Sequence, residues 1–201
     1  MKIVVIAGKE GIFPGNGAEI IYADNIQAAG TYPDADAVID LGENGGTGNH
    51  SGFSVPVFIN SMTETLSELK ASPNMIRVNA WPGFLDNEIL EVAGNMNAVA
   101  AKVLKSLGKK FISVPDEPGF VSARVIAMII NEAFFAKGED VSSEEDIDIA
   151  MKLGTNYPYG PFEWCRKIGM ENVYGLLKKL SASNEKYSPA PAMEIEMKNH
   201  R

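Results

Sequence analysis

The sequence has only one cysteine and two histidines, and it contains no long apolar run. A single cysteine, Cys165, cannot form an internal disulfide, so we expect a protein of the reducing cytoplasm. No apolar run approaches the roughly 20 residues that a membrane-spanning helix needs. The apolar start at residues 3–7 is followed at once by Lys9 and Glu10. This pattern favours a first β-strand over a secretory signal.

Positive charge is also scarce. The chain has 18 Lys and Arg against 26 Asp and Glu, which gives a net charge of −8. Residues 1–110 carry 8 basic and 12 acidic side chains and residues 111–201 carry 10 and 14, so each part has a charge of −4. Without a basic patch or tail, nucleic acids and anionic membranes are excluded as main partners. The acidic net charge is still compatible with a small anionic ligand, because a helix N-terminus can hold a phosphate.

Short β-branched runs separated by loops make up the first half of the chain. Strands are expected at residues 2–7, 19–24, 35–41, 55–60, 75–81 and 109–114. A helix with Ser61 as its N-cap and Glu64 as the reciprocal partner should join the fourth strand to the fifth. A strand–helix–strand unit implies a parallel α/β sheet. The connections at residues 9–18 and 42–52 are too rich in Gly and Pro for helices, so a Rossmann-like sheet with fewer helices is predicted.

The second half of the chain indicates helices. Residues 115–119 break the chain after the last strand, so the predicted domains are 1–114 and 115–201. Residues 120–137 form an apolar helix that should be buried in a bundle or against a second subunit. Residues 142–145 form a capping box for a helix that ends at Gly154. The predicted fold class is therefore α/β followed by all-α.

Several motifs occur in order along this second half. They are D-x-P-G-F-V at 116–121, N-E-A at 131–133, D-I-D-x-A-M at 146–151 and P-x-G-P-F at 158–162. The set resembles the C-terminal helical domain of 3-hydroxyacyl-CoA dehydrogenases, which is similar to that of 6-phosphogluconate dehydrogenases. The resemblance implies an NAD-dependent oxidoreductase of fatty acid metabolism that acts on a 3-hydroxyacyl-CoA and forms a homodimer through this domain.

The first half resembles the same family more faintly, and catalytic positions can be matched one by one. I-L-E-V-A-G at 89–94 matches the stretch that carries an orienting glutamate, which implies that role for Glu91. A serine stretch matches at Ser61. The position of the family's catalytic histidine falls on Pro82, and that of its asparagine is Ala123. Since base catalysis needs a titratable group beside the alcohol, the family's base is missing.

The cofactor loop departs from the family pattern as well. Residues 7–17 contain glycines, but not at the G-x-G-x-x-G spacing that brings backbone N–H groups to a pyrophosphate. The resemblance assigns Gly8 and Gly11 to the cofactor loop and Asp24 to the ribose. His50 is either a substitute base or an exposed loop residue. Residues 42–52 either cradle a phosphate or replace a helix.

Three hypotheses follow from these matches and departures. The first is a family member without ordinary NAD-dependent dehydrogenation that still binds an acyl-CoA. The second is an active oxidoreductase on a 3-hydroxyacyl-CoA or 3-hydroxy acid with a non-standard site. The third is a non-catalytic dimeric scaffold. No metal site is predicted, because the acidic residues 145–148 fit the first turn of a helix.

Overall fold

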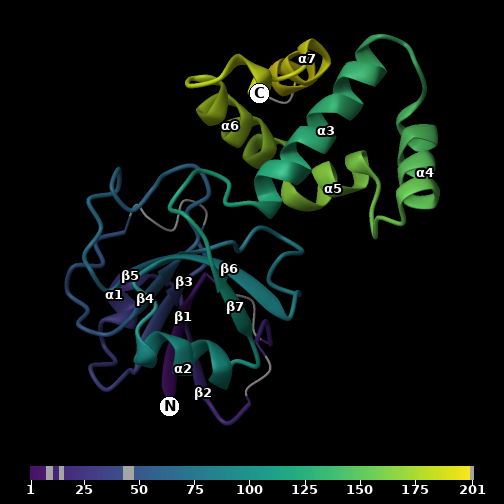
Figure 1. Cartoon of the computed structure of the whole chain (residues 1–201). Helices are drawn as coiled ribbons and strands as arrows, with labels where there is room; N and C mark the ends of the chain where they lie inside the picture. The colour runs from purple at the N-terminus through teal and green to yellow at the C-terminus, as the bar shows by residue number, and fades with distance from the viewer. Residues whose placement is uncertain (8–10, 14–15, 43–47, 200–201) are drawn as a thin grey trace. The chain divides into compact units, whose positions relative to one another are not determined.

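The computed structural model describes residues 1–7, 11–13, 16–42 and 48–199, and it contains two compact units, Met1–Phe120 and Val121–Arg201. Figure 1 shows a sheet with a few short helices in the first unit and helices in the second. The first unit extends six residues beyond the expected boundary after residue 114. The reason is local, because Asp116 and Phe120 both contact the buried side chain of Arg77 on a strand of the sheet.

A seven-stranded sheet forms the first unit, in the order β2-β1-β3-β4-β5-β6-β7. The strands are β1 (Lys2–Ile6), β2 (Glu19–Ala23), β3 (Ala37–Asp40), β4 (Val57–Ile59), β5 (Met75–Val78), β6 (Ile89–Gly94) and β7 (Lys110–Ser113). β1 to β5 are parallel, β6 is antiparallel to β5, and β7 is parallel to β6. The predicted Rossmann-like α/β sheet is confirmed, whereas the reversed strand β6 was not predicted.

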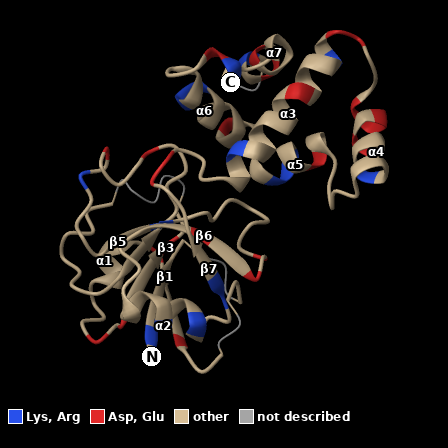
Figure 2. Ribbon diagram, in the orientation of Figure 1, with Lys and Arg blue, Asp and Glu red and all other residues tan. Residues whose placement is uncertain are grey.

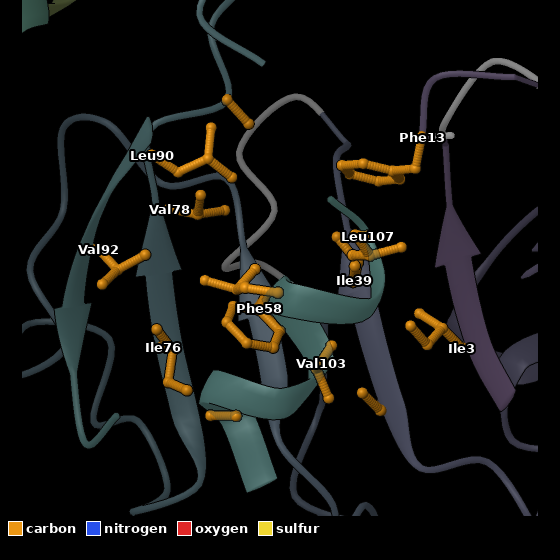
Figure 3. Packing of buried hydrophobic residues seen from close by; sticks show 14 of the residues in the cluster. Ile3, Phe13, Ile39, Phe58, Ile76, Val78, Leu90, Val92, Val103 and Leu107 are labelled. Atoms are coloured by element: carbon orange, nitrogen blue, oxygen red, sulfur yellow. The ribbon is translucent and has the colours of Figure 1, made fainter. Parts of the chain in front are cut away.

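The two faces of this sheet are covered differently. On one face α2 (Ala98–Ser106) packs on the sheet, with Val103 and Leu107 against the strand residues Phe58 and Ile76, as Figure 3 shows. On the opposite face the structure describes only the short helix α1 (Ile26–Ala29). Side chains alternate between the two faces of a strand, so the polar residues of the strands can gather on this second face.

One connection of the sheet differs from the expectation, and the described parts of two others do not. The segment after β4 forms turns in place of the predicted helix, so the expected helix at Ser61 is wrong. The Ser61 hydroxyl donates to the carbonyl of Glu64 (3.0 Å) and therefore does not cap a helix. In the glycine-rich connections, the described residues 11–13, 16–18 and 48–52 contain no helix, as predicted.

The second unit consists of helices. They are α3 (Ser122–Gly138), α4 (Glu144–Thr155), α5 (Pro161–Ile168), α6 (Met170–Ser181), the short 3₁₀ helix η1 (Glu185–Tyr187) and α7 (Pro191–Asn199). The apolar helix α3 packs against α4, α5, α6 and α7, so it is buried in a bundle of its own chain. The helices η1 and α7 were not predicted. Among the residues described, no helix has the length and apolarity to cross a bilayer.

Helix α4 shows how local chemistry sets its ends. The N-cap is Ser143, whose hydroxyl accepts from the N–H of Asp146 (3.1 Å). Figure 2 shows acidic residues at the start of α4 and a basic residue near its end, the arrangement that the helix dipole favours. The helix continues past the expected end at Gly154 and stops at Asn156, which has a left-handed conformation (φ 56°). Asparagine tolerates this conformation better than most residues.

Candidate functional site

The carboxyl ends of the parallel strands are the usual ligand-binding edge of such a sheet, and a fully buried arginine lies close to it. Arg77 on β5 is 0% exposed. Its Nε donates to the carbonyl of Ser61 (2.8 Å), and one terminal nitrogen donates to Asp116 (2.5 Å). The guanidinium also lies 4.5 Å from the ring centre of Phe120. Burial lowers the pKa of Arg77, although Asp116 opposes this effect. Arg77 thus links β5 to the loop at Ser61 and to the loop at Asp116.

Glu91 lies on the same face, one strand further along. It is buried (8% exposed) on β6, directly across from the end of β5. Its carboxylate accepts a hydrogen bond from the side-chain amide of Asn79 (3.0 Å), and both residues are buried. An amide cannot take up a proton at neutral pH. Asn79 is therefore a hydrogen-bond donor to Glu91 without base character.

The Pro82 position lies in a turn. The N–H of Phe84 donates to the carbonyl of Trp81 (2.9 Å), and Gly83 has φ 93°. Pro followed by Gly with positive φ is the usual sequence of a type II turn. Pro82 itself is exposed at the corner of this turn, while Trp81 is buried. The residue that matches the family histidine is therefore a turn former.

His50 is buried, so the expectation of an exposed loop residue is wrong. Its Nε2 lies 2.9 Å from Oδ2 of Asp40 at the end of β3, and its side chain is 0% exposed. The Nδ1 atom is buried and has no hydrogen-bond partner among the residues that the structure describes. Because β4 and β5 separate β3 from β6 at about 4.8 Å per step, the strand of Asp40, to which His50 is bonded, lies about 14 Å from the strand of Glu91. His50 therefore cannot serve as the base that Glu91 orients.

Of the predicted cofactor residues, the structure describes Gly11 and Asp24. Gly8 lies outside the described residues. The N–H of Gly11 donates to the hydroxyl of Tyr22 (2.9 Å), so this amide is already bonded. Asp24 is exposed after β2. No helix follows β1 among the described residues, and α1, which follows β2, has only four residues. The described residues thus do not fit the pyrophosphate of a dinucleotide, which is bound at the N-terminus of a helix after the first strand.

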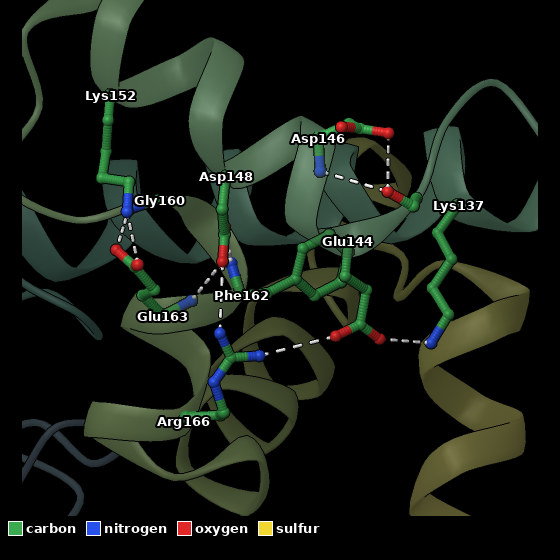
Figure 4. Close-up of polar contacts among 10 residues, drawn as sticks. Lys137, Glu144, Asp146, Asp148, Lys152, Gly160, Phe162, Glu163 and Arg166 are labelled. Carbon is green, nitrogen blue, oxygen red and sulfur yellow. Dashed lines mark hydrogen bonds and ion pairs between the residues drawn. The ribbon is translucent and has the colours of Figure 1, made fainter.

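In the second unit, the side chain of Asp148 stabilises the start of α5. It is buried, and its carboxylate accepts from the N–H groups of Phe162 (2.8 Å) and Glu163 (3.2 Å) in the first turn of α5. Arg166 also donates to it (3.2 Å), as Figure 4 shows. Asp148 therefore caps α5 from α4, and the expectation that it serves the first turn of its own helix is wrong. No group of three potential metal ligands occurs in the described part of the chain.

Cys165 is a buried residue of α5 itself. Burial raises the pKa of its thiol to about 12. Since the thiolate is the nucleophilic form, this cysteine is a poor nucleophile at neutral pH.

Comparison with known proteins decides the family. The model of the 3-hydroxyacyl-CoA dehydrogenase C-terminal domain matches residues 119–200. Residues 119–200 therefore belong to the C-terminal domain family of 3-hydroxyacyl-CoA dehydrogenases. The 3-hydroxyadipyl-CoA dehydrogenase of Escherichia coli is 44% identical over 88 residues, which are 43% of this chain and 18% of that protein. A probable 3-hydroxybutyryl-CoA dehydrogenase of Bacillus subtilis is 37% identical over 128 residues, which are 63% of this chain and 42% of that protein.

Structural comparison extends the likeness to both units. The crystal structure of (S)-3-hydroxybutyryl-CoA dehydrogenase from Ralstonia eutropha has a TM-score of 0.74 and 23% identity, covering 99% of this chain and 94% of that chain. At this identity the likeness shows the fold alone. The chain spans less than half the length of the two curated relatives above.

The dehydrogenase fold is therefore present, while its expected site residues are only partly brought together. The Ser61 carbonyl and Asp116 meet at Arg77, and Glu91 meets Asn79. Ala123 is fully buried on α3. Sequence reasoning missed the contacts of Asn79 and Arg77. Their spacing of two residues on one strand was the available signal, because it places both side chains on the same face.

Proposed function

We propose that this member of the 3-hydroxyacyl-CoA dehydrogenase family does not catalyse ordinary NAD-dependent dehydrogenation and that it binds an acyl-CoA. The observation that carries the first part is the pairing of Glu91 with the amide of Asn79. In the family, the resemblance places a histidine base beside this glutamate. Proton transfer needs a titratable group within hydrogen-bond reach of the substrate hydroxyl, and an amide does not supply one.

The acyl-CoA part rests on the relatives. Their names specify 3-hydroxyadipyl-CoA and 3-hydroxybutyryl-CoA as the compounds on which those proteins act. The family model matches residues 119–200, which are nearly the whole second unit of this chain. NAD binding has less support than acyl-CoA binding, because the N–H of Gly11 is bonded to Tyr22 and no helix follows β1 in the described residues.

Steady-state reduction of acetoacetyl-CoA by NADH tests the proposal. We expect no NADH oxidation above the rate without protein. We also expect acetoacetyl-CoA to raise the melting temperature, because a ligand that binds only the native state stabilises it. Turnover that is lost in Glu91→Gln would instead establish the active oxidoreductase. Absence of both turnover and thermal stabilisation would contradict acyl-CoA binding.

The variant Asn79→His separates loss of the base from loss of the cofactor. It places an imidazole on the strand position that faces Glu91, whereas Pro82→His places one at the corner of an exposed turn. We expect neither variant to oxidise NADH, because the altered cofactor loop remains. Activity in Asn79→His alone would show that NADH still binds and that only the base is missing.

A non-catalytic homodimeric scaffold is the second candidate, and an exposed apolar stripe on α4 favours it. Ile149 is 50% exposed and Leu153 is 83% exposed, one turn apart on the same helix. Exposed apolar patches often mark protein–protein contacts. We expect sedimentation velocity to show a dimer that Leu153→Glu converts to a monomer. Leu153→Gln separates the charge from the lost apolar contact, and a monomeric native protein would contradict the scaffold.

A further inference from the structure

A cavity of about 600 Å³ lies in the first unit, between α1 and residues 49–55. Tyr32, Ala35 and Val55 line it on the segments that lead into β3 and β4. The cavity therefore reaches the amino ends of these strands, whereas doubly wound sheets bind cofactors at the carboxyl ends. Its volume falls within the range of about 300–1,000 Å³ typical of small-molecule sites.

Among the described residues that line this cavity, none has a charged side chain. Ile26, Tyr32 and Phe53 contribute apolar and aromatic surface, and Gln27 and Asn49 contribute side-chain amides. A charged ligand would lose hydration here without gaining a counter-charge, which is costly. The ring of an aromatic ligand would pack on the apolar side chains of the lining, and a neutral polar group on that ligand would bond to the side-chain amides.

Hydrogen bonds hold the wall at residues 49–55 in place without a ligand. The side-chain amide of Asn74 donates to the carbonyls of Phe53 (2.8 Å) and Val55 (2.6 Å). The N–H of Phe53 donates to the carbonyl of His50 (3.2 Å), and His50 is bonded to Asp40 (2.9 Å). This wall is therefore fixed at both ends, at one by Asn74 and at the other by the buried pair of His50 with Asp40.

The opposite wall is also held by its own bonds. The side chain of Asn25 accepts from the N–H of Ala28 (2.9 Å) and so caps α1. The N–H of Tyr32 donates to the carbonyl of Ala29 (3.2 Å), and the N–H of Ala35 donates to that of Tyr32 (3.1 Å). Pre-organised walls reduce the entropy cost of binding, which distinguishes a built site from a surface gap.

We propose that this cavity binds an uncharged aromatic small molecule, at a site separate from the dehydrogenase chemistry of the family. The inference goes beyond the proposed function and does not depend on it. The functional role implied is recognition of a neutral ring compound at the helix-poor face of the sheet.

Fluorescence titration of the full chain tests this site with two related probes. N-phenylnaphthylamine is uncharged, and anilinonaphthalene sulfonate has the same rings with a sulfonate added. We expect saturable binding of one molecule of the uncharged probe per chain and at least about tenfold weaker binding of the sulfonated one, a ratio equivalent to about 1.4 kcal/mol. Equal binding of both probes, or no saturable binding of the uncharged probe, would overturn the proposal.

Two variants locate the bound probe. Gly52 lines the cavity, and a Cβ there meets no atom within 4 Å, so Gly52→Phe should fold and fill the cavity. The matched control is Gly154→Phe on α4, where a Cβ also meets nothing within 4 Å. We expect about tenfold weaker binding in the first variant and no change in the second. Gln27→Glu, which adds a charge to the lining, should also weaken binding.

Two results would show that the probe binds elsewhere. Unchanged binding in both Gly52→Phe and Gln27→Glu would place the probe on another apolar surface, such as the exposed stripe of α4. Competitive displacement of the probe by NADH would assign the cavity to a nucleotide site. Either result would contradict a separate site, whatever the outcome of the acetoacetyl-CoA assay.

Discussion

Replacing Arg77 with methionine is expected to lower the free energy of unfolding of the first unit by about 3–5 kcal/mol, the usual cost of breaking a buried ion pair from one side. The side chain of Arg77 is fully buried, and Asp116 is its charged partner at 2.5 Å. The substitution leaves the Asp116 carboxylate without its counter-charge and the Ser61 carbonyl without the bond from Nε. Methionine keeps much of the length of the side chain, so the decrease in the free energy of unfolding arises mainly from the lost polar contacts.

Urea unfolding followed by circular dichroism measures this effect. The matched control is Lys110→Met, because Lys110 pairs with Glu88 at the surface, where both side chains are about two-thirds exposed. We expect no measurable change there, as is common for exposed ion pairs. Adding Asp116→Asn to Arg77→Met should recover part of the stability, because the unpaired carboxylate is gone and Asn can still accept from the N–H of Leu66. A loss no larger than that of the control would contradict the assigned role of Arg77.

The same arginine explains why one element could not be predicted from the sequence. The pattern after β4 favours a helix locally, with Ser61 and Glu64 at capping distance. In the structure the Ser61 carbonyl is bonded to Arg77, and the N–H of Leu66 donates to Asp116 (2.8 Å), 50 residues further along the chain. These long-range bonds compete with the helix for the same backbone groups. Local patterns contain no information about such partners.

The parts that could be predicted depend on nearby residues. The strands β1 and β3 are apolar apart from Lys2 at the start of β1 and Asp40 at the end of β3, as is typical of buried parallel strands, and the sequence shows this directly. The burial of His50 could not be predicted, because its partner Asp40 becomes a neighbour only when the connection after β3 returns to the sheet. The pairing of Glu91 with Asn79 required the reversed direction of β6, for which the sequence offered no sign.

Replacing Gly160 with alanine is expected to lower the free energy of unfolding of the second unit by about 2–4 kcal/mol, which combines overpacking with the loss of a helix cap. A Cβ at this position would lie 2.3 Å from Oδ1 and 2.4 Å from Cβ of Asp148. The carboxylate would have to leave the N–H of Phe162, to which it is bonded at 2.8 Å. Gly154→Ala is the matched control, because its Cβ meets no atom within 4 Å. Within α4 we expect it to be neutral or to stabilise by up to about 1 kcal/mol.

A double-mutant cycle shows whether the clash acts through Asp148. Asp148→Ala alone should also destabilise the unit, because it leaves the first turn of α5 uncapped and Arg166 without this partner. In that background Gly160→Ala should cost much less than in the native chain, because residues in contact are not additive. Equal costs of Gly160→Ala in both backgrounds would contradict the mechanism. If the coupling is found, the D-I-D-x-A-M and P-x-G-P-F motifs are two halves of one helix cap. These motifs would then be needed for the fold of the C-terminal domain, which is consistent with their presence in a chain that we propose lacks the family's catalytic base.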